Sequence, residues 1–415
     1  MALISDRFMD DGQSILPLSD IQHKYIGIYN RKCETGEYSY RKLECECGQG
    51  DFEVIAKKDR YGIPIDTVIC RNCGLIITNP CLDDKSNNEF YDNEYPFIYR
   101  AEEKPSEEAF QDGKRAAGSI ISFIRKYTGK QTGKVLEIGC ADGRNIAAFD
   151  ESGYDACGID LSHTYVEFGK SKGLNLICTD AETFEKQGHR FDIIVLNHVL
   201  EHFTNPGREL GVIRKMLKPE GCLFVAVPGV RALAFNTYES DFLRMLQNAH
   251  IYNFTGTTLC NVMRKYGFAS IYCNEFIYSV FRKCDPEESF NNAYEETMNF
   301  LRKTEEEKGN IVPLLIERAK GIISSYGEGE VLLYGTATEL DVIVQKTRNL
   351  APIKGFFYTD AKTPGEVAKF IRTSGGSVKC ILVVDTKENK RLVQELSDAI
   401  DCSQINLYSV YSEVF

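Results

Sequence analysis

The chain has 415 residues, 43% of them hydrophobic and 26% charged, so it is long enough for two or three domains with sizeable cores. Its formal net charge of -11 argues against a surface that binds nucleic acid or anionic lipid through bulk electrostatics. No apolar run is long enough to span a bilayer, and residues 1–20 carry acids in place of a basic and then apolar signal, so we expect no membrane partner and a cytoplasmic location. The odd number of cysteines, several within predicted strands, argues against a disulfide framework.

Two cysteine pairs, each followed by a glycine, stand in the first hundred residues. They are Cys45 with Cys47 and, after 22 intervening residues, Cys70 with Cys73. Four thiolates in two such pairs suit a tetrahedral zinc site, so we predict a zinc-binding segment over residues 1–100 with a structural metal. The first pair is one residue short of the usual spacing, which leaves Cys33 or Cys81 as an alternative to Cys45. The other reading is four thiols without a metal.

Strand and helix patterns alternate over residues 107–283. A helical pattern at 107–127 precedes short apolar runs that read as buried strands at 135–138, 154–159, 174–178, 191–196 and 222–227. A helix is predicted at 256–266 with Thr255 as its N-cap, followed by strands at 270–274 and 276–281. This alternation favours a doubly wound, mostly parallel sheet.

The turn after the first of these strands has Gly139 and Gly143 at its ends, which lets a ligand lie against the backbone. Asp142 between them would repel a pyrophosphate, so a nucleoside without phosphates fits better than a dinucleotide. Asp160, 21 residues after Gly139, can accept hydrogen bonds from both ribose hydroxyls, and Asp180 with the next residue can meet an adenine edge. The plainer reading is an ordinary strand-helix turn with a surface carboxylate.

Five features in this region recur in the order seen in class I S-adenosylmethionine-dependent methyltransferases, which the chain resembles over about 130 residues. They are Leu136-Glu137-Ile138-Gly139-Cys140, Gly158-Ile159-Asp160, Asp180-Ala181, Phe191-Asp192 with Asn197-His198-Val199-Leu200-Glu201-His202, and Leu217-Lys218-Pro219-Glu220-Gly221. The resemblance implies S-adenosylmethionine as cofactor. The residues expected to hold it are Glu137, Gly139, Cys140, Gly143, Asp160, Leu161, Asp180, Ala181, Asn197 and His198.

The rest of the chain predicts a helical connector at 284–326 and a second, smaller α/β domain at 327–415. The connector contains two amphipathic patterns, and the domain has apolar runs at 331–334, 354–358, 379–384 and 405–408 separated by helical stretches. We therefore predict an α/β protein with a Rossmann-like doubly wound methyltransferase sheet, an N-terminal zinc-binding segment and a Rossmann-like C-terminal domain. The turn after the first C-terminal strand has a single glycine, a weak indication of a nucleotide phosphate.

This domain order resembles the sugar methyltransferases that act on nucleotide-linked deoxyhexoses, especially those that methylate carbon. In that family a histidine follows the fourth strand and a Glu-His pair comes later. His202 matches the first histidine and His250 the second, whereas position 249 is Ala instead of Glu. Methylation of carbon beside a ketone needs removal of a carbon-bound proton, so loss of the carboxylate favours a hydroxyl acceptor.

We predict His202 first and His250 second as the group that accepts the acceptor's proton, since an imidazole titrates near cytoplasmic pH. Tyr252 and Glu201 are expected to orient them. The plainer alternatives are that Glu201 and His202 only hold the start of a helix and that His250 only packs. The expected partner is a sugar or nucleotide sugar; the competing hypotheses are another small molecule, a scaffold that binds the cofactor without catalysis, and a nucleic-acid methyltransferase, which the acidic charge disfavours.

Overall fold

The computed structural model describes residues 3–100, 105–235, 237–275, 278–307, 312–335, 337–347, 349–359, 361–374, 376–384, 389–400 and 405–409. The chain divides into two compact units. The first comprises Met1–Arg231 and Phe242–Glu305, and the second comprises Ala232–Asp241 and Glu306–Phe415.

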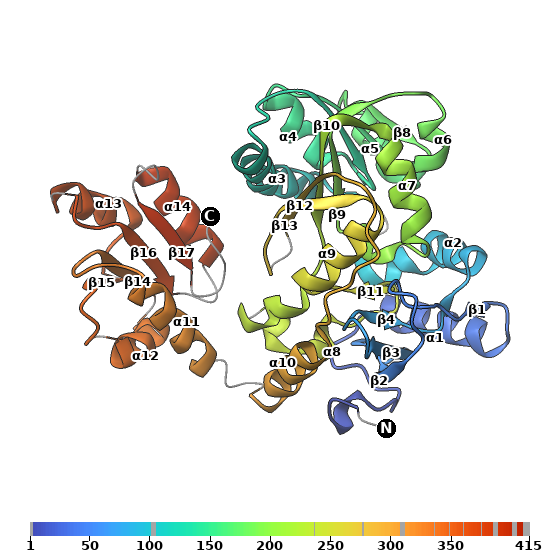
Figure 1. Ribbon diagram of the computed structural model, residues 1–415, viewed down its shortest axis with the longest axis horizontal. Helices are drawn as coiled ribbons and strands as arrows, with labels where there is room; N and C mark the ends of the chain where they lie inside the picture. The colour runs from blue at the N-terminus through green and yellow to red at the C-terminus, as the bar shows by residue number, and fades with distance from the viewer. Residues whose placement is uncertain are drawn as a thin grey trace. The chain divides into compact units, whose positions relative to one another are not determined.

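A seven-stranded sheet forms the centre of the first unit, with the strand order β12-β13-β10-β9-β6-β7-β8 (Figure 1). Its strands are β6 (Lys134–Ile138), β7 (Asp155–Asp160), β8 (Leu176–Cys178), β9 (Phe191–Asn197), β10 (Leu217–Ala226), β12 (Phe268–Cys273) and β13 (Tyr278–Lys283). The strands from β6 to β10 are parallel, and β13 runs antiparallel to both its neighbours. Because β7 and β9 lie on opposite sides of β6, the winding reverses at β6, which places a ligand-binding crevice at its carboxyl end. The predicted doubly wound sheet is confirmed.

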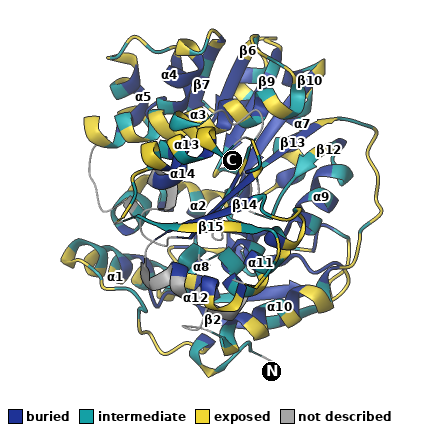
Figure 2. Cartoon of the chain, turned by 90° about the vertical axis from the view of Figure 1, so that its left-hand side faces the viewer, coloured by how far each residue is buried: buried dark blue, intermediate teal, exposed yellow. Residues whose placement is uncertain are grey.

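Helices cover both faces of this sheet, and alternate residues of β6 point to opposite sides. Val135 packs in one core with residues of α3 (Glu107–Thr128) and α4 (Arg144–Glu151). Leu136 and Ile138 pack in the other, with α6 (Ala181–Glu185), α7 (Pro206–Met216) and α9 (Gly256–Lys265). The central strands are accordingly buried along most of their length (Figure 2). Apolar burial of this kind is the main favourable term that holds the carboxyl-edge loops in place.

The N-terminal segment shares a sheet with a strand from the region predicted to belong to the cofactor domain. This four-stranded antiparallel sheet has the order β11-β4-β3-β2, from β11 (Tyr252–Asn253), β4 (Ile76–Thr78), β3 (Pro64–Cys70) and β2 (Phe52–Lys58). Core residues of β3 and β4 pack in the same cluster as residues of β6 and β9. The predicted division between residues 1–100 and 107–283 therefore does not separate two independent bodies, because both lie within the first compact unit.

Two short helices flank this sheet in the sequence. The segment at 21–29, which the sequence left open between strand and helix, lies within α1 (Asp20–Glu34). Ser19 and Gln22 form a capping box at its start, which satisfies amides that a helix terminus leaves unpaired. Further along, β1 (Tyr40–Arg41) pairs with β5 (Cys81–Leu82), and α2 (Asp84–Asn93) follows.

The predicted helical connector divides between the two units. In the first unit, α10 (Tyr294–Glu306) begins seven residues later than predicted (294 against 287) and is anchored by the Ala293 amide, which donates to the Cys73 carbonyl at 3.2 Å. In the second unit, α11 (Val312–Ser324) contributes Leu315, Ala319 and Ile323 to the core. Each helix thus belongs to a core, and the two are not a free-standing connector.

The second unit contains a four-stranded parallel sheet of order β15-β14-β16-β17. Its elements are β14 (Val331–Gly335), α12 (Ala337–Thr347), β15 (Ile353–Tyr358), α13 (Pro364–Thr373), β16 (Cys380–Val384), α14 (Asn389–Ala399) and β17 (Asn406–Ser409). Residues of α11 and α12 share a core with Val331 and Leu333, and residues of α13 and α14 share another with Leu332 and Tyr334. This is a small doubly wound arrangement. Thr336, in the turn after β14, lies outside the described residues.

Candidate active site

The loop after β6 is held open by glycines in left-handed conformations. Gly139 has φ of +72° and Gly143 has φ of +77°. A Cβ at Gly139 would lie 2.6 Å from Cγ2 of Val199, so no larger residue fits between this loop and the chain that leaves β9. The amides of Gly139 and Cys140 donate to the Ile159 carbonyl at 2.8 and 3.1 Å, which fixes the loop against the end of β7.

Asp160, the predicted ribose-binding acid, lies beside this loop at the end of β7. Its carboxylate accepts hydrogen bonds from the amides of Ala141 at 2.8 Å and Ser162 at 2.7 Å. The side chain is therefore fixed on the edge of the sheet where the crevice is expected. Leu161, the next residue, is 69% exposed, which is unusual for a large apolar side chain and suits a surface that a ligand covers.

Asp142 does not have the role that the sequence suggested. It is 0% exposed, and its two carboxylate oxygens accept hydrogen bonds from Arg144 Nε at 2.8 Å and Nη2 at 2.6 Å. A buried carboxylate in a bidentate pair with an arginine presents no net charge to a ligand. The argument that Asp142 repels a pyrophosphate is therefore wrong, and the preference for a phosphate-free nucleoside depends on the other residues of the loop.

Glu137 is the buried carboxyl group beneath the loop. It is 2% exposed, Oε1 accepts a hydrogen bond from Asn145 Nδ2 at 2.6 Å, and Oε2 has no hydrogen-bond partner among the described residues. Burial raises the pKa of Glu137 to about 8, and the negative charge of Asp160 acts in the same direction. An unpartnered carboxylate oxygen beside a glycine loop suits a ligand with positive charge, which S-adenosylmethionine carries on its sulfonium and ammonium groups. Asn145 was not among the residues predicted from the sequence.

The remaining predicted cofactor residues lie along the same edge of the sheet. Asp180 caps α6, since its carboxylate accepts from the Thr183 amide at 2.7 Å and from the Thr183 hydroxyl at 2.8 Å, and Ala181 behind it is buried. Asn197 is the last residue of β9, and His198 after it has φ of +58°, a strained conformation outside glycine. The sheet brings these residues to one end of the parallel strands, as expected.

The four predicted zinc ligands form one cluster. Cys45 Sγ lies 3.5 Å from Cys73 Sγ, Cys47 Sγ lies 3.6 Å from Cys70 Sγ, and all four sulfurs lie within 4.8 Å of one another. Zinc with thiolates at about 2.3 Å in a tetrahedron separates them by about 3.8 Å, so the cluster fits this ion. Cys33 and Cys81, the alternatives drawn from the sequence, are not in this group.

The protonation of these thiols also points to a cation. Sharing of hydrogen bonds with Cys70 and Cys73 holds the pKa of Cys45 far above its usual range, whereas the hydrogen bond from Cys45 holds the pKa of Cys70 well below it. Thiolates this close together repel one another, so a positive charge between them favours ionisation of the whole cluster.

A second cluster forms around Glu201, in the short helix η3 (Leu200–His202) that follows β9. Glu201 Oε1 lies 3.9 Å from His202 Nε2, 3.8 Å from His250 Nε2 and 3.5 Å from His198 Nδ1. Glu201 is 1% exposed, and neither of its oxygens has a hydrogen-bond partner in the part of the chain that the structure describes. The residues predicted as catalytic, apart from Tyr252, are thus brought together around one buried carboxylate.

The N-terminal segment holds this cluster in place. His202 Nδ1 lies 2.9 Å from the Ala249 carbonyl and 2.7 Å from the Tyr91 hydroxyl. The Ile251 amide donates to the Glu201 carbonyl at 2.9 Å, which sets His250 beside η3, and the Thr78 hydroxyl donates to the His250 carbonyl at 2.8 Å. Tyr91 is therefore a contact of the site that lies outside the methyltransferase motifs.

Tyr252 does not join the cluster. Its hydroxyl donates to Glu46 Oε1 at 3.1 Å, and its ring stacks with Phe254 at a centroid distance of 5.8 Å. Glu46 lies between two of the cysteine ligands, so Tyr252 anchors β11 to the cysteine segment. The expectation that Tyr252 orients the catalytic histidines is not supported, because its hydroxyl contacts Glu46 instead. No sequence pattern indicated this contact, since β11 was not recognised as a strand of the N-terminal sheet.

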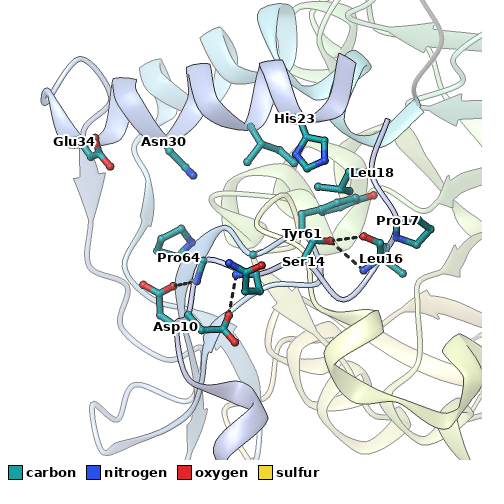
Figure 3. Close-up of a pocket in the computed structure, with 15 residues that line it drawn as sticks. Asp10, Ser14, Leu16, Pro17, Leu18, His23, Asn30, Glu34, Tyr61 and Pro64 are labelled. Carbon is teal, nitrogen blue, oxygen red and sulfur yellow. Dashed lines mark hydrogen bonds between the residues drawn. The ribbon is translucent and has the colours of Figure 1, made fainter. Parts of the chain in front are cut away.

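A separate cavity of about 710 Å³ lies between α1 and the loop residues before it. Figure 3 shows His23, Asn30 and Glu34 of α1 on one side and Tyr61 and Pro64 on the other. Its lining contains none of the residues predicted for the cofactor, the metal or catalysis. The cavity is not part of the candidate active site.

Comparison with known proteins identifies the middle of the chain. Residues 109–272 match the family described as "Methyltransferase domain". A "Ubiquinone biosynthesis O-methyltransferase" of Coxiella burnetii (strain Dugway 5J108-111) is 32% identical over 123 residues, which cover 27% of this chain and 53% of that protein. A protein of the same name from Bartonella tribocorum (strain CIP 105476 / IBS 506) is 31% identical over 99 residues, which cover 22% of this chain and 40% of that protein. The chain thus spans about half the length of these relatives, or less.

Two solved structures with partial similarity to this chain are also named methyltransferases. The Burkholderia thailandensis 1,6-didemethyltoxoflavin-N1-methyltransferase with S-adenosylhomocysteine is 18% identical, with a TM-score of 0.36, over 51% of this chain and 96% of that one. Magnesium protoporphyrin IX methyltransferase from Synechocystis with bound S-adenosylmethionine is 16% identical, with a TM-score of 0.34, over 50% and 100%. From the family match and the strand order, residues 109–272 form a class I S-adenosylmethionine-dependent methyltransferase domain. Among the described residues, no helix is long and apolar enough to cross a membrane.

Proposed function

We propose that this chain transfers a methyl group from S-adenosylmethionine to a hydroxyl group of a small molecule. The observation that carries the proposal is the edge of the sheet at β6, where Gly139, Asp160 and the unpartnered oxygen of Glu137 lie together. A glycine loop, a fixed carboxylate and a buried acid suit a nucleoside with positive charge. The family match of residues 109–272 supports the same reading.

The chain's own residues mainly position the reactants. S-adenosylmethionine supplies a methyl group on a sulfonium, so transfer forms a bond from carbon to the acceptor oxygen and breaks the carbon–sulfur bond, whose electron pair stays on sulfur. Glu137 and Asp160 would hold the cofactor, and Val199 would keep the glycine loop in place. Alignment of the acceptor oxygen with the methyl group then accounts for much of the rate enhancement.

The acceptor side of the site is the Glu201 cluster. It follows directly after β9, and its neighbour Val199 touches the glycine loop, so an acceptor beside it would face the cofactor. In this proposal His202 or His250 accepts the proton that the hydroxyl releases. Burial, and then repulsion from His202, holds the pKa of His250 well below its ordinary value, so His250 is neutral near pH 7 and has the lone pair that a base needs.

The acceptor itself is proposed as a sugar hydroxyl, carried on a nucleotide or on a glycan precursor. Residue 249 is Ala and offers only its backbone carbonyl to the site, which supports a hydroxyl over a carbon acceptor. The relatives' name, with its O-methyltransferase activity, supports oxygen as the methylated atom but points to a quinone precursor. A phenol is therefore the second candidate for the acceptor.

We propose that Cys45, Cys47, Cys70 and Cys73 hold a structural zinc ion. Its role would be to fix the turns beside β3 and β4, which in turn position the segment that carries His250. The metal would supply no chemistry to the methyl transfer.

Isotope-labelled S-adenosylmethionine incubated with nucleotide sugars, free sugars and dihydroxyphenols tests the function directly. Mass spectrometry of the products identifies the acceptor and the methylated atom. We expect transfer to oxygen, and loss of turnover in the double variant His202→Ala with His250→Ala. Calorimetry that detects no binding of S-adenosylmethionine or S-adenosylhomocysteine would refute the proposal, and transfer only to phenols would replace the sugar by the second candidate.

A further inference from the structure

The Glu201 cluster has an unsatisfied charge that a proton-accepting role does not explain. A carboxylate that is 1% exposed and has no hydrogen-bond partner in the described chain is costly, because burial removes its hydration without replacing it. The groups nearest to it are imidazole nitrogens at 3.5 to 3.9 Å, which is too far for hydrogen bonds. The cluster therefore lacks a positive charge at its centre.

The orientation of His202 shows what kind of charge fits. Its Nδ1 lies 2.9 Å from the Ala249 carbonyl, and a carbonyl only accepts, so Nδ1 carries the proton. In the neutral ring Nε2 then has its lone pair towards Glu201. An imidazole whose other nitrogen donates to a backbone carbonyl is the usual arrangement of a metal-binding histidine.

His250 offers the third ligand. It is 4% exposed, and its Nδ1 has no hydrogen-bond partner among the described residues, while Nε2 accepts a hydrogen bond from the side-chain amide of Gln247. That amide is oriented by Arg60, which donates to Gln247 Oε1 at 2.9 Å. A cation held through Nε2 would replace the hydrogen bond from Gln247.

We propose that Glu201, His202 and His250 hold a divalent cation with coordination positions left open for the oxygen of the acceptor. One oxygen or nitrogen atom from each of the three residues lies within 4.8 Å of the others. Ligand atoms about 2.1 Å from an ion stand about 3.0 Å apart in an octahedron and about 3.4 Å apart in a tetrahedron. The separations of 3.8 and 3.9 Å from Glu201 would therefore close by about 0.4 to 0.9 Å when the ion binds. Two imidazoles and a carboxylate suit a first-row ion such as Mn²⁺ or Co²⁺.

The ion would change the role of the histidines. A nitrogen whose lone pair binds a metal cannot accept a proton, so this inference replaces the proposed base by Lewis-acid activation. A hydroxyl bound to the ion loses its proton to water more readily, and the resulting oxygen forms the bond to the methyl carbon while sulfur keeps the pair of the broken bond. His198, 59% exposed and 3.5 Å from Glu201, marks the side of the cluster that is open to solvent.

The inference rests on the proposed function, because the site binds an acceptor oxygen only if it transfers a methyl group. The competing arrangement is a protonated His202 that forms an ion pair with Glu201. Such an ion pair would balance the carboxylate without a metal, so a measurement of metal binding distinguishes the two arrangements.

Titration of the zinc-loaded full chain with Mn²⁺, followed by electron paramagnetic resonance of the free ion, tests the site. Manganese suits oxygen and nitrogen ligands and not thiolates, so the cysteine cluster does not interfere. We expect one Mn²⁺ per chain, affinity lowered by about 10- to 100-fold or more in Glu201→Gln and His202→Ala, and a faster methyl transfer when Mn²⁺ is added. His189→Ala, which removes an exposed imidazole elsewhere, should bind Mn²⁺ as the unchanged chain does.

Calorimetry with S-adenosylhomocysteine on the same samples shows that each variant is folded and keeps the two proposals apart. Binding of this compound without binding of Mn²⁺, or equal Mn²⁺ affinity in Glu201→Gln, would overturn the metal site alone. Binding of Mn²⁺ without S-adenosylhomocysteine would instead overturn the proposed function. Asp160→Asn gives the opposite pattern to Glu201→Gln: it should lose the nucleoside and keep the ion.

Discussion

The cysteine cluster and the Glu201 cluster are both groups of metal-binding residue types, but the fold assembles them differently. The four cysteines come from two short pairs, which β3 and its neighbouring turns bring together. In the Glu201 cluster, Glu201 and His202 are adjacent, whereas His250 reaches them only because β11 pairs with β4. Spacing in the sequence therefore reveals the first cluster, and only the topology reveals the second.

The two clusters also differ in how their charges are balanced. The cysteine sulfurs lie within hydrogen-bonding distance in two pairs, so thiol protons can stabilise the cluster in part without a metal. Glu201 has no such partner among the described residues. An ion in the cysteine cluster would therefore mainly stabilise the fold, whereas an ion at Glu201 would mainly serve the acceptor.

The largest expected effect is therefore loss of stability when a cysteine ligand is removed. Cys70→Ser should abolish zinc binding and lower the free energy of unfolding by more than about 4 kcal/mol, because the metal contributes directly to the folding of its segment. Zinc content by mass spectrometry and denaturant unfolding measure this effect. Since β4 holds the segment of His250, methyl transfer should fall as well.

Cys33→Ser is the matched control for this variant. Cys33 was a possible ligand from spacing alone, but it lies outside the cluster and accepts a hydrogen bond from the Tyr40 hydroxyl at 2.9 Å. Its replacement should leave one zinc per chain. An unchanged chain that purifies without zinc, or equal loss in both variants, would show that the cysteine cluster is not a metal site.

Local pattern was enough to predict most of the fold. Short apolar runs gave the parallel strands of both sheets to within about five residues, since buried parallel strands are nearly continuous in apolar residues. Thr255, predicted as an N-cap, forms a capping box with Thr258 at the start of α9. The order of glycines and acids along the carboxyl edge also followed from the motifs.

Contacts between distant parts of the chain could not be predicted. β11 is only two residues long and has no pattern of its own, so its pairing with β4, and the resulting places of His250 and Tyr252, were not visible.

One local contact was also missed. The pairing of Asp142 with Arg144, two residues away, was overlooked because the motif was interpreted through the ligand and not through the neighbouring side chains.

Like Glu201, Glu137 is a buried carboxyl group with an oxygen that has no hydrogen-bond partner among the described residues. Burial raises its pKa to about 8, so the folded chain keeps a proton that the unfolded chain loses above about pH 4.3. The folded state therefore binds more protons between these values, and its stability falls as pH rises from about 5 to about 8. Glu137→Gln removes this pH-dependent loss. The difference in the free energy of unfolding between the variant and the unchanged chain should therefore shift in favour of the variant by up to about 1.4 kcal/mol for each pH unit.

The same substitution should weaken binding of the cofactor. Positive charge on S-adenosylmethionine favours the ionised carboxylate, so its affinity for the unchanged chain should rise with pH towards 9, while Glu137→Gln should bind it about tenfold more weakly and without this dependence. Thermal unfolding and calorimetry at pH 6, 7 and 8 give both quantities. Parallel pH profiles of stability in the two proteins would contradict the raised pKa.

The smallest expected effect concerns Tyr91, through which the N-terminal segment touches the Glu201 cluster. Tyr91→Phe removes the hydroxyl that lies 2.7 Å from His202 Nδ1, while the Ala249 carbonyl still holds that nitrogen. One hydrogen-bonding partner of this nitrogen is lost, so we expect a cost of about 0.5 to 1 kcal/mol, seen as a roughly two- to fivefold weaker affinity for Mn²⁺ and a similar fall in kcat, with KM for S-adenosylmethionine unchanged. Tyr25→Phe is the control, since the Tyr25 ring stacks with Phe97 at a centroid distance of 4.0 Å in the same segment. If Tyr91→Phe lowers thermal stability but neither constant, then this segment only packs beside the Glu201 cluster, and the cluster owes its geometry to β11 and β9 alone.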